Sequence, residues 1–384
     1  MEKEAKIFVA GGTGMVGSAI IRKLIEKGYK NILSNYHIRP PHNTSYVKYE
    51  KLDLTRQEDT EKFFEKEKPN YVFLAAAKVG GILANNTYKA EFMYDNMAIA
   101  LNVIHSSFKY GVKKLLNLGS SCIYPKHAPQ PLKEECLLTG SLEPTNEPYA
   151  IAKISAIKLC RYYNEQYNTN FISVMPTNLY GPNDNYNLET AHVLPALIRK
   201  FHLAKLLDQE EFESIKKDLR SHPIGFGLSL RDNPTKDEIL SILKKIGIIY
   251  NHLNPHRSQI TLWGSGSPYR EFLYVDDLAD ACVFLMERYD YQDIGEFVNI
   301  GTGEDNTIKE LAHMIKEIVG FKGNIVWNTS KPDGIPRKLL DISRIRDLGW
   351  KPKIELREGI RKIYKEEFEL QCSEFNGMDK EEDI

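Results

Sequence analysis

The fold of this chain is decided near its start by one stretch, Ile7-Phe8-Val9-Ala10-Gly11-Gly12-Thr13-Gly14-Met15-Val16-Gly17. It joins a short apolar strand to a turn of the pattern GxxGxxG, which opens a helix. The glycines let the chain turn tightly, let backbone N–H groups approach a pyrophosphate and let the helix pack closely on the strand. A bare glycine pattern also occurs as a simple loop, but its position directly after a strand is typical of dinucleotide binding. We therefore expect this turn to bind the pyrophosphate of a dinucleotide.

Short apolar runs alternate with helical patterns through the first half of the chain. Between the runs, apolar residues recur at helical spacing, as in Ala19 to Glu26 and Ile99 to Tyr110. This alternation predicts parallel βαβ units, and hence an α/β fold with a Rossmann-type doubly wound parallel sheet. After the first strand, the expected strands lie in the runs Asn31 to Ser34, Tyr71 to Ala77, Leu115 to Gly119 and Phe171 to Met175.

The rhythm loosens after about Asn183, which predicts a smaller C-terminal mixed α/β domain that binds the substrate. The predicted division is a dinucleotide-binding domain at 1–182, to which later segments can return, a substrate domain at 183–372 and a frayed acidic tail at 373–384. The expected elements of the second domain are helices at Val193 to Leu206 and Thr307 to Val319, and strands at Ile260 to Trp263 and Phe297 to Ile300.

One segment of the second domain, at about 207–255, is rich in charged and turn residues. Thr235 to Glu238 has the form of a capping box, and apolar residues follow it at helical spacing from Ile239 to Ile246. We therefore expect at least one ordered amphipathic helix there rather than a linker. Its effect on the substrate is left open, because insertions usually lie on surfaces.

Composition excludes several classes of protein. The 384 residues carry 51 basic and 52 acidic side chains and a net charge of -1, so no general electrostatic attraction to nucleic acid or to an anionic membrane is expected. The 5 cysteines are scattered and show no CxxC spacing, which argues against a disulfide framework and a metal site. No run approaches the length of a membrane span, and the start Met1-Glu2-Lys3-Glu4 is charged. These observations predict a cytoplasmic globular enzyme.

The loop after the second strand reads Ser34-Asn35-Tyr36-His37-Ile38-Arg39. A carboxylate at this place would bind the ribose 2′-hydroxyl of NAD, and none is present. His37 or Arg39 could instead pair with the 2′-phosphate of NADP, although both are also ordinary residues of a solvated loop. The loop therefore favours NADP. Asp53, at the end of the next strand, is a plausible contact for adenine.

Tyr149 and Lys153 form a YxxxK pair, whose i,i+4 spacing places both side chains on one face of a helix. An ammonium beside a phenol lowers the phenol's pKa, so Tyr149 could exchange a proton with a carbonyl near neutral pH. Ser120 follows the run Leu115 to Gly119, at the edge where doubly wound sheets bind ligands. Its hydroxyl can bind the same carbonyl oxygen. The three residues predict a carbonyl reductase.

Longer motifs make the chain resemble the GDP-L-fucose synthase family, the GDP-4-keto-6-deoxy-mannose epimerase/reductases among the extended short-chain dehydrogenases. The resemblance extends over almost the full chain apart from 207–255. Its marks are LAAAKVGGILANNTY at Leu74 to Tyr88, LGSSCIYPK at Leu118 to Lys126, EPTNEPYAIAK at Glu143 to Lys153, MPTNLYGP at Met175 to Pro182, WGSG at Trp263 to Gly266, REFLYVDD at Arg270 to Asp277, and SKPDG with PRKLLD between Ser330 and Asp341.

The resemblance implies a two-part reaction on a GDP-linked 4-keto sugar. Protons at C3 and C5 are first exchanged by a cysteine and a histidine, which match Cys122 and His192, and hydride from NADPH then reduces C4. Tyr149 matches the proton donor to O4, Ser120 its partner, and Lys153 a residue that also holds the nicotinamide ribose. Relatives form homodimers through paired helices, and the same assembly is expected here.

The resemblance also implies binding residues. Lys200 stands where the family has a substrate arginine, which keeps the charge but loses the bidentate geometry of a guanidinium. The expected substrate contacts are Val193, Lys200, Trp263, Arg270, Asp333 and Lys338. The expected cofactor contacts are the turn Gly11 to Gly17, Asn35, His37, Arg39, Asp53, Leu54, Ala75, Ala76, Ala77, Leu118, Gly119, Ser121, Lys153, Pro176, Thr177, Asn178, Leu179 and His192.

Several alternatives stay open at the level of sequence. A GDP-4-keto-heptose could replace the hexose, because the segment at 207–255 borders the expected sugar site, and the chain could reduce C4 beside a separate epimerase. A 4,6-dehydratase would need a carboxylate that Ser121-Cys122-Ile123 does not offer. A 4-epimerase that retains NAD, or a catalytically silent nucleotide-binding paralogue, are the remaining readings.

Overall fold

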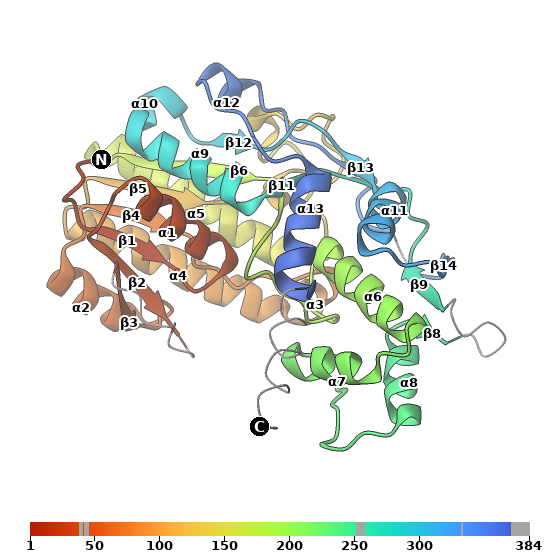
Figure 1. Cartoon of the computed structure of the whole chain (residues 1–384). Coiled ribbons are helices and arrows are strands. Elements are labelled where there is room, and N and C mark those ends of the chain that lie inside the picture. The colour runs from red at the N-terminus through yellow and green to blue at the C-terminus, as the bar shows by residue number, and fades with distance from the viewer. Residues whose placement is uncertain (38–40, 42–45, 251–257, 332, 370–384) are drawn as a thin grey trace, which may run out of the picture.

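The computed structural model describes residues 1–37, 41, 46–250, 258–331 and 333–369 (Figure 1). Arg39, part of the predicted insertion and the predicted tail lie outside the described residues. No described helix is long and apolar enough to cross a membrane.

The central element is a seven-stranded sheet with the strand order β12-β6-β5-β4-β1-β2-β3. All its pairings are parallel, and most of its central residues are buried, as expected when helices cover both faces. The strand order reverses at β1 and β4, which is the topological switch point of a doubly wound fold. The strands are β1 (Ile7–Ala10), β2 (Ile32–Tyr36), β3 (Val47–Lys51), β4 (Tyr71–Leu74), β5 (Lys114–Leu118), β6 (Phe171–Pro176) and β12 (Val298–Ile300). The predicted Rossmann-type sheet is therefore confirmed.

Helices cover both faces of this sheet (Figure 1). Side chains from α1 and α9 pack together on one face with Ile7 and Val9, although the two helices are far apart in the sequence. On the other face, Phe63 and Phe64 of α2 pack on Phe8, beside α4 and α5. These helices are α1 (Met15–Glu26), α2 (Gln57–Glu67), α4 (Lys89–Lys109), α5 (Glu147–Tyr167) and α9 (Val275–Arg288).

A second apolar cluster lies beside the sheet and contains much of the region after residue 180. It combines a parallel pair, β9 with β14, and helices from both sides of the 207–255 segment. Its elements are α6 (Val193–Asp208), α7 (Phe212–Ser221), α8 (Lys236–Lys245), β8 (Ile248–Ile249), β9 (Gln259–Trp263), α11 (Ile308–Val319), β14 (Asn324–Asn328), α13 (Leu356–Tyr364) and a π-helix at Lys365–Glu369.

The described part of the 207–255 segment is ordered. Ile215, Leu219, Ile239 and Leu243 are buried in the second apolar cluster, and α7 and α8 extend from it at one end of the molecule (Figure 1). The predicted capping box is confirmed, because Thr235 Oγ1 accepts from the N–H of Glu238 at 3.2 Å and Glu238 accepts from the N–H of Thr235 at 2.9 Å.

Short strands connect the second apolar cluster to the sheet. β10 (Tyr269–Arg270) lies between β13 (Asn306–Thr307) and β15 (Arg337–Lys338), and β11 (Phe272–Tyr274) pairs with β7 (Asn178–Tyr180). The parallel register of β10 and β15 puts Arg270 beside Lys338. The remaining helices are α3 (Ile82–Thr87), α10 (Tyr291–Ile294), α12 (Ser343–Asp347) and the 3-10 turns Ser121–Ile123 and Glu134–Cys136.

Candidate active site

Backbone atoms leave no space for a side chain at two positions of the glycine turn. Gly11 has φ +83°, and a Cβ there would lie 2.7 Å from Cα of Ala76. A Cβ on Gly17 would lie 2.2 Å from the carbonyl oxygen of Gly11. Thr13 and Gly14 are exposed, and Gly14 is the N-cap of α1, whose first residues are Met15 and Val16. The first N–H groups of α1 therefore stand at the carboxyl end of β1, as an anion site requires.

Two side chains of β2 hold this turn. Asn35 is buried, accepts a hydrogen bond from the N–H of Gly11 at 2.8 Å and donates to the carbonyl of Leu52 at 3.1 Å. Ser34 Oγ accepts from the N–H of Gly12 at 3.1 Å. Asn35 thus orders the turn, a role that the sequence argument did not assign to it. Its predicted contact with a cofactor stays a prediction.

His37 and Asp53 lie together at the ends of β2 and β3. His37 Nε2 is 3.5 Å from a carboxylate oxygen of Asp53, and the His37 side chain is largely exposed. Burial raises the pKa of Asp53, but hydrogen bonds from Thr55 and the neighbouring charge of His37 outweigh this and lower it. Leu54 is buried in the core beneath, so its side chain packs rather than faces solvent.

The carboxyl ends of β4, β5 and β6 bring the other predicted cofactor residues to the same edge of the sheet. The N–H of Ala75 bonds to the carbonyl of Ala10 at 3.1 Å, Ala76 lies against Gly11, and Ala77 follows. Leu118 and Gly119 end β5 and precede Ser121, while Thr177 and Asn178 both donate to the carbonyl of Glu271, at 3.3 and 2.8 Å. Pro176 ends β6, and Leu179 lies in β7.

The predicted catalytic residues meet just beyond β5. Ser120 Oγ lies 2.8 Å from Cys122 Sγ, and Ser120 also hydrogen-bonds Tyr149. Lys153 is buried, donates to the carbonyl of Leu118 at 2.7 Å, and places its ammonium 5.7 Å from the centre of the Tyr149 ring. The structure therefore brings Ser120 and Cys122, which follow β5, into contact with Tyr149 and Lys153, which lie on α5.

The protonation of Tyr149 differs from expectation. Burial first, and then the nearby Cys122, raise the pKa of Tyr149, and the hydrogen bond from Ser120 lowers it only in part. The prediction of a lowered pKa for Tyr149 is therefore wrong, because desolvation by burial is the largest cause of the shift. Burial also lowers the pKa of Lys153 to about 8. Tyr149 is thus a neutral phenol near pH 7, which suits a proton donor.

His192 stands at the N-cap of α6, and Val193 is the first residue of that helix. The ring of His192 is solvent-accessible, yet protein atoms crowd around it, and this desolvation lowers the pKa of His192, helped by the charge of Lys338. Lys338 also interacts electrostatically with Cys122. Lys338 is therefore an electrostatic neighbour of both residues expected to exchange protons, and its lowered pKa keeps His192 neutral near pH 7.

The other predicted substrate residues lie on α6, β9, β10 and the loop before β15. Arg270 donates to the carbonyls of Tyr269 and Ile335 at 2.7 and 2.6 Å, and Asp333 accepts from the N–H of Ser265 at 2.9 Å. Trp263 is 53% exposed. Lys200 lies on α6, where burial lowers its pKa to about 8.

Glu271 is a residue of this region that sequence reasoning missed. It is buried, and its carboxylate accepts from the N–H groups of Thr302, Gly303 and Leu340 at 2.6, 2.8 and 3.0 Å. Together with its carbonyl, which binds Thr177 and Asn178, it fixes the loop between β6 and β7. Its place between Arg270 and Phe272, inside one of the family motifs, was the available signal.

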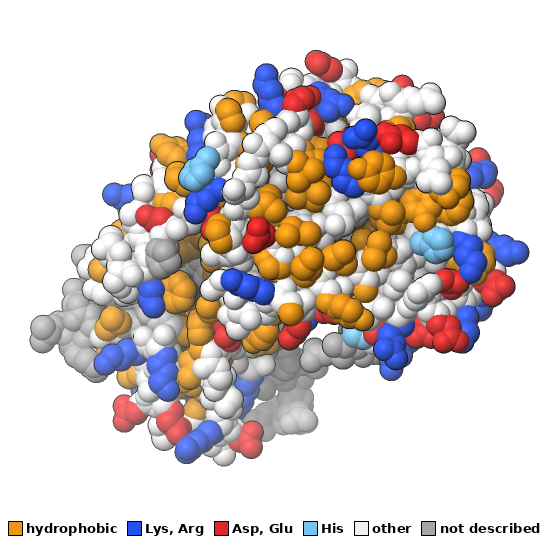
Figure 2. All heavy atoms as spheres, turned by 180° about the vertical axis from the view of Figure 1, so that it is seen from behind, with side chains coloured by type: hydrophobic (Ala, Val, Ile, Leu, Met, Phe, Trp, Pro, Cys, Tyr) orange, Lys and Arg blue, Asp and Glu red, His pale blue; other side chains and the backbone are white. Residues whose placement is uncertain are grey.

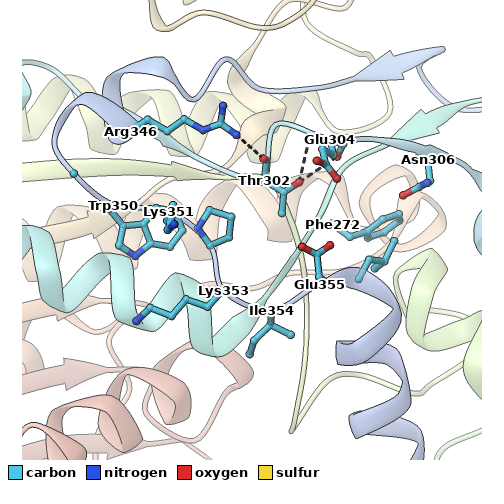
Figure 3. A pocket seen from close by; sticks show the side chains of 13 residues that line it. Phe272, Thr302, Glu304, Asn306, Arg346, Trp350, Lys351, Lys353, Ile354 and Glu355 are labelled. Atoms are coloured by element: carbon cyan, nitrogen blue, oxygen red, sulfur yellow. Dashed lines mark hydrogen bonds between the residues drawn. The ribbon is translucent and has the colours of Figure 1, made fainter.

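A hollow of about 480 Å³ lies elsewhere, at Trp350 to Leu356, and its lining includes Phe272 and Arg346 (Figure 3). Arg346 donates to the carbonyl of Thr302 at 3.4 Å on its rim. No residue of the Ser120, Tyr149 and Lys153 group lines it. We therefore do not assign the chemistry to this hollow.

The fold and the site together define a short-chain dehydrogenase/reductase of the extended type, with a dinucleotide turn after β1 and a Ser-Tyr-Lys group beyond β5. The sequence model of the NAD dependent epimerase/dehydratase family matches residues 7–219 and 241–301. The chain therefore belongs to this family, and within it to the GDP-L-fucose synthases. It is 51% identical to GDP-L-fucose synthase 1 of Arabidopsis thaliana, over 94% of this chain and 93% of the relative.

More distant proteins agree with this placement. GDP-L-fucose synthase of Escherichia coli is 43% identical, over 94% of this chain and 95% of its own. A GDP-6-OMe-4-keto-L-xylo-heptose reductase from C. jejuni superposes with a TM-score of 0.84 at 39% identity, over 97% of this chain and 99% of that one. A GDP-mannoheptose C4 reductase from Campylobacter jejuni with NADP bound gives 0.78 at 40% identity, over 95% and 98%.

Proposed function

We propose that the chain uses NADPH to reduce C4 of a GDP-4-keto-6-deoxy sugar after exchanging the protons at C3 and C5. The observation that carries this proposal is the group of Ser120, Cys122, Tyr149 and Lys153, which contact one another beyond β5. Cys122 and His192 also share Lys338 as an electrostatic neighbour. Relatives at 51% and 43% identity are GDP-L-fucose synthases. Turnover of GDP-4-keto-6-deoxy-mannose with NADPH, followed by NMR of the product, tests it directly.

The residues fit a bound dinucleotide. A Cβ on Gly11 or Gly17 would collide with backbone, so the turn keeps its N–H groups accessible to a pyrophosphate. NADPH, when bound, supplies the hydride for C4. His37 and Arg39 are proposed to prefer the 2′-phosphate, and Lys153 to hold the nicotinamide ribose. Titration with NADPH and NADH decides this preference, and equal or tighter binding of NADH would remove the argument from this loop.

For the reduction, Tyr149 donates its phenolic proton to O4 as C4 accepts the hydride, so the ketone becomes an alcohol. The raised pKa of Tyr149 keeps this proton available near neutral pH. Ser120 orients O4 through a hydrogen bond. The lowered pKa of Lys153, about 8, lets that side chain help return a proton to Tyr149 after each turnover.

For the epimerisation, the 4-ketone acidifies the protons at C3 and C5. One member of the Cys122 and His192 pair removes such a proton to leave an enolate, and the other returns a proton to the opposite face of the same carbon. A neutral His192 can accept a proton, and its lowered pKa favours this form. Arg270, Asp333, Trp263, Val193, Lys200 and Lys338 are proposed to hold the GDP-sugar, with Arg270 suited to a diphosphate.

A C4-reductase of a GDP-4-keto-heptose is the second candidate. It is supported by two heptose reductases at 39% and 40% identity that superpose over 97% and 95% of this chain. Product NMR with hexose and heptose substrates separates the two candidates. A protein that oxidises no NADPH with any of these sugars would instead be the silent nucleotide-binding paralogue.

We also propose a homodimer formed through α4 and α5. These adjacent helices expose Tyr94 (70%), Leu101 (44%), Tyr162 (53%) and Tyr167 (48%). The view from behind shows hydrophobic side chains gathered over the middle of that side of the molecule (Figure 2). Such an exposed apolar patch is typical of an association surface. Sedimentation of wild type and Tyr94→Glu tests the proposal, because a dimer through this face would dissociate.

We also propose that the protein is located in the cytoplasm.

A further inference from the structure

Arg199 joins three segments, one of which is the turn that precedes His192 in the chain. It lies on α6 next to Lys200, and its side chain is fully buried. Its Nε donates to Asp218 Oδ1 at 2.9 Å, and its Nη1 donates to the carbonyls of Tyr186 and Pro223 at 2.8 and 2.7 Å. Its Nη2 donates to the carbonyl of His222 at 3.0 Å. One guanidinium thus fixes α6, the end of α7 and the turn before His192.

The charge of Arg199 is balanced inside this junction. Asp218 is buried, and although its burial raises its pKa, the neighbouring His222, whose Nδ1 lies 3.4 Å from Asp218 Oδ2, and the charge of Arg199 outweigh that and lower it. Removing one member of a buried ion pair leaves a desolvated charge, which is strongly unfavourable. The end of α7 is therefore held firmly against α6 and the turn.

A second contact joins the same two segments. Glu189 Oε2 accepts from the N–H of Phe226 at 2.5 Å. Gly225 has φ +82°, and a Cβ there would lie 2.4 Å from Cβ of Glu189 and 2.6 Å from Oδ1 of Asn187. Residues 222–226 therefore lie directly on the turn at 186–189.

The opposite side of that turn is held as well. The N–H of Gly81 donates to the carbonyl of Thr190 at 2.8 Å, and a Cβ on Gly81 would lie 2.5 Å from the carbonyl oxygen of Ala191. The turn at 186–191 is thus enclosed between the start of α3 and residues 222–226. His192 follows immediately as the N-cap of α6.

We propose that residues 218–226 are a positioning element for His192, and that Arg199 is the residue that couples them to it. The family model leaves residues 220–240 unmatched, so most of this element lies outside the shared family pattern, whereas His192 lies inside it. The consequence for catalysis rests on the proposed function, because it assigns proton exchange to His192. The positional coupling between residues 218–226 and His192 does not depend on the proposed function. The expected effect falls on C3 and C5 proton exchange and spares cofactor binding.

Two glycines provide a matched test. Gly225 and Gly227 both have positive φ, +82° and +65°, so alanine strains the backbone at either position. Among the described residues, nothing lies within 4 Å of a Cβ on Gly227, whereas a Cβ on Gly225 presses on the turn before His192. Gly225→Ala and Gly227→Ala therefore differ mainly in the steric clash of the new methyl group with the turn before His192. Glu189→Ala, which removes the acceptor of the Phe226 N–H, is the second variant if Gly225→Ala fails to fold.

The first readout is the imidazole NMR signal of His192 in protein labelled at histidine Cε1, assigned by its loss in His192→Asn. Gly225→Ala, or Glu189→Ala, should shift this signal and its titration midpoint, while Gly227→Ala should superimpose on wild type. The second readout is deuterium entry at C3 and C5 of GDP-4-keto-6-deoxy-mannose without NADPH. It should fall by up to about 10²-fold in Gly225→Ala, the cost of a misplacement of about 1 Å, with NADPH affinity kept.

The outcomes separate the inference from the proposed function. If wild type incorporates no deuterium with any accepted sugar, the proposed epimerisation fails, and the imidazole signals alone decide the coupling. If the folded Gly225→Ala or Glu189→Ala variant gives the same His192 signal as Gly227→Ala, residues 218–226 do not position His192, whatever the enzyme catalyses.

Discussion

The glycine turn after β1 and the sugar-facing group around His192 both contribute to the site, but they depend on different contacts. The turn is more local: Gly11 has φ +83°, the carbonyl oxygen of Gly11 occupies the space of a Cβ on Gly17, and Asn35 lies only 24 residues from Gly11. The group around His192 joins residues from β5, α6 and β15. One region follows from backbone geometry, and the other exists only when distant segments pack.

The largest expected loss of turnover follows from a substitution at Tyr149, which belongs to neither region. Tyr149→Phe removes the proton donor and leaves the glycine turn intact. NADPH oxidation with a GDP-4-keto sugar should fall by about 10²–10⁴-fold, the usual worth of general acid catalysis, while NADPH binding persists. Tyr162→Phe, at a half-exposed position of the same helix, is the control for turnover. Near-normal turnover in Tyr149→Phe would mean that another group protonates O4.

Gly11→Ala should damage the cofactor region selectively. Gly11 and Gly28 share φ +83°, but a Cβ lies 2.7 Å from Ala76 at the first and within 4 Å of no described atom at the second. Overpacking costs about 1–3 kcal/mol, so the free energy of unfolding of Gly11→Ala should be lower than that of Gly28→Ala by about this amount, as measured by denaturant titration. NADPH should also bind at least about tenfold more weakly, as a loss of about 1.4 kcal/mol implies. Equal behaviour of the two variants would contradict the role of the turn.

Lys200 should make the affinity for GDP depend on pH, whereas the glycine turn contains no titratable side chain. Burial holds the pKa of Lys200 at about 8, below its ordinary value, so the ammonium is present below that pH and lost above it. Affinity for GDP should therefore fall as pH rises through about 8, by about tenfold if Lys200 holds the diphosphate. Lys200→Arg keeps its charge and should flatten this profile in calorimetric titrations from pH 7 to 9. Parallel profiles in both proteins would remove Lys200 from the diphosphate site.

The smallest expected effect concerns the helix α8. Thr235→Ala removes the side-chain cap and should lower the free energy of unfolding by about 1 kcal/mol. The glycine turn is far from this cap in the chain, so NADPH affinity should not change. Urea denaturation and a cofactor titration measure both quantities. A large loss of cofactor affinity would show that the two regions are not independent.

Features that depend on a local sequence pattern could be predicted from the sequence, whereas features that depend on the packing of distant segments could not. The parallel sheet, the glycine turn and the capping box at Thr235 could be predicted because each depends on a local pattern of residues. The chemistry of Cys122 and His192 came only through the resemblance, since neither residue has a local signal. The raised pKa of Tyr149 was missed because desolvation depends on packing around the folded site, and the sequence indicated only the neighbouring ammonium. Arg199 and Glu271 were missed because their partners come from distant segments.

The most direct test of the central claim compares wild type with Cys122→Ser and His192→Asn in deuterated water, with GDP-4-keto-6-deoxy-mannose and NADPH. Wild type should place deuterium at C3 and C5 and form the epimerised alcohol. Both variants should lose this label at C3 or C5 but still oxidise NADPH, yielding an unepimerised sugar, because Tyr149 and Lys153 remain. Unlabelled product from wild type would contradict the claim that Cys122 and His192 exchange these protons.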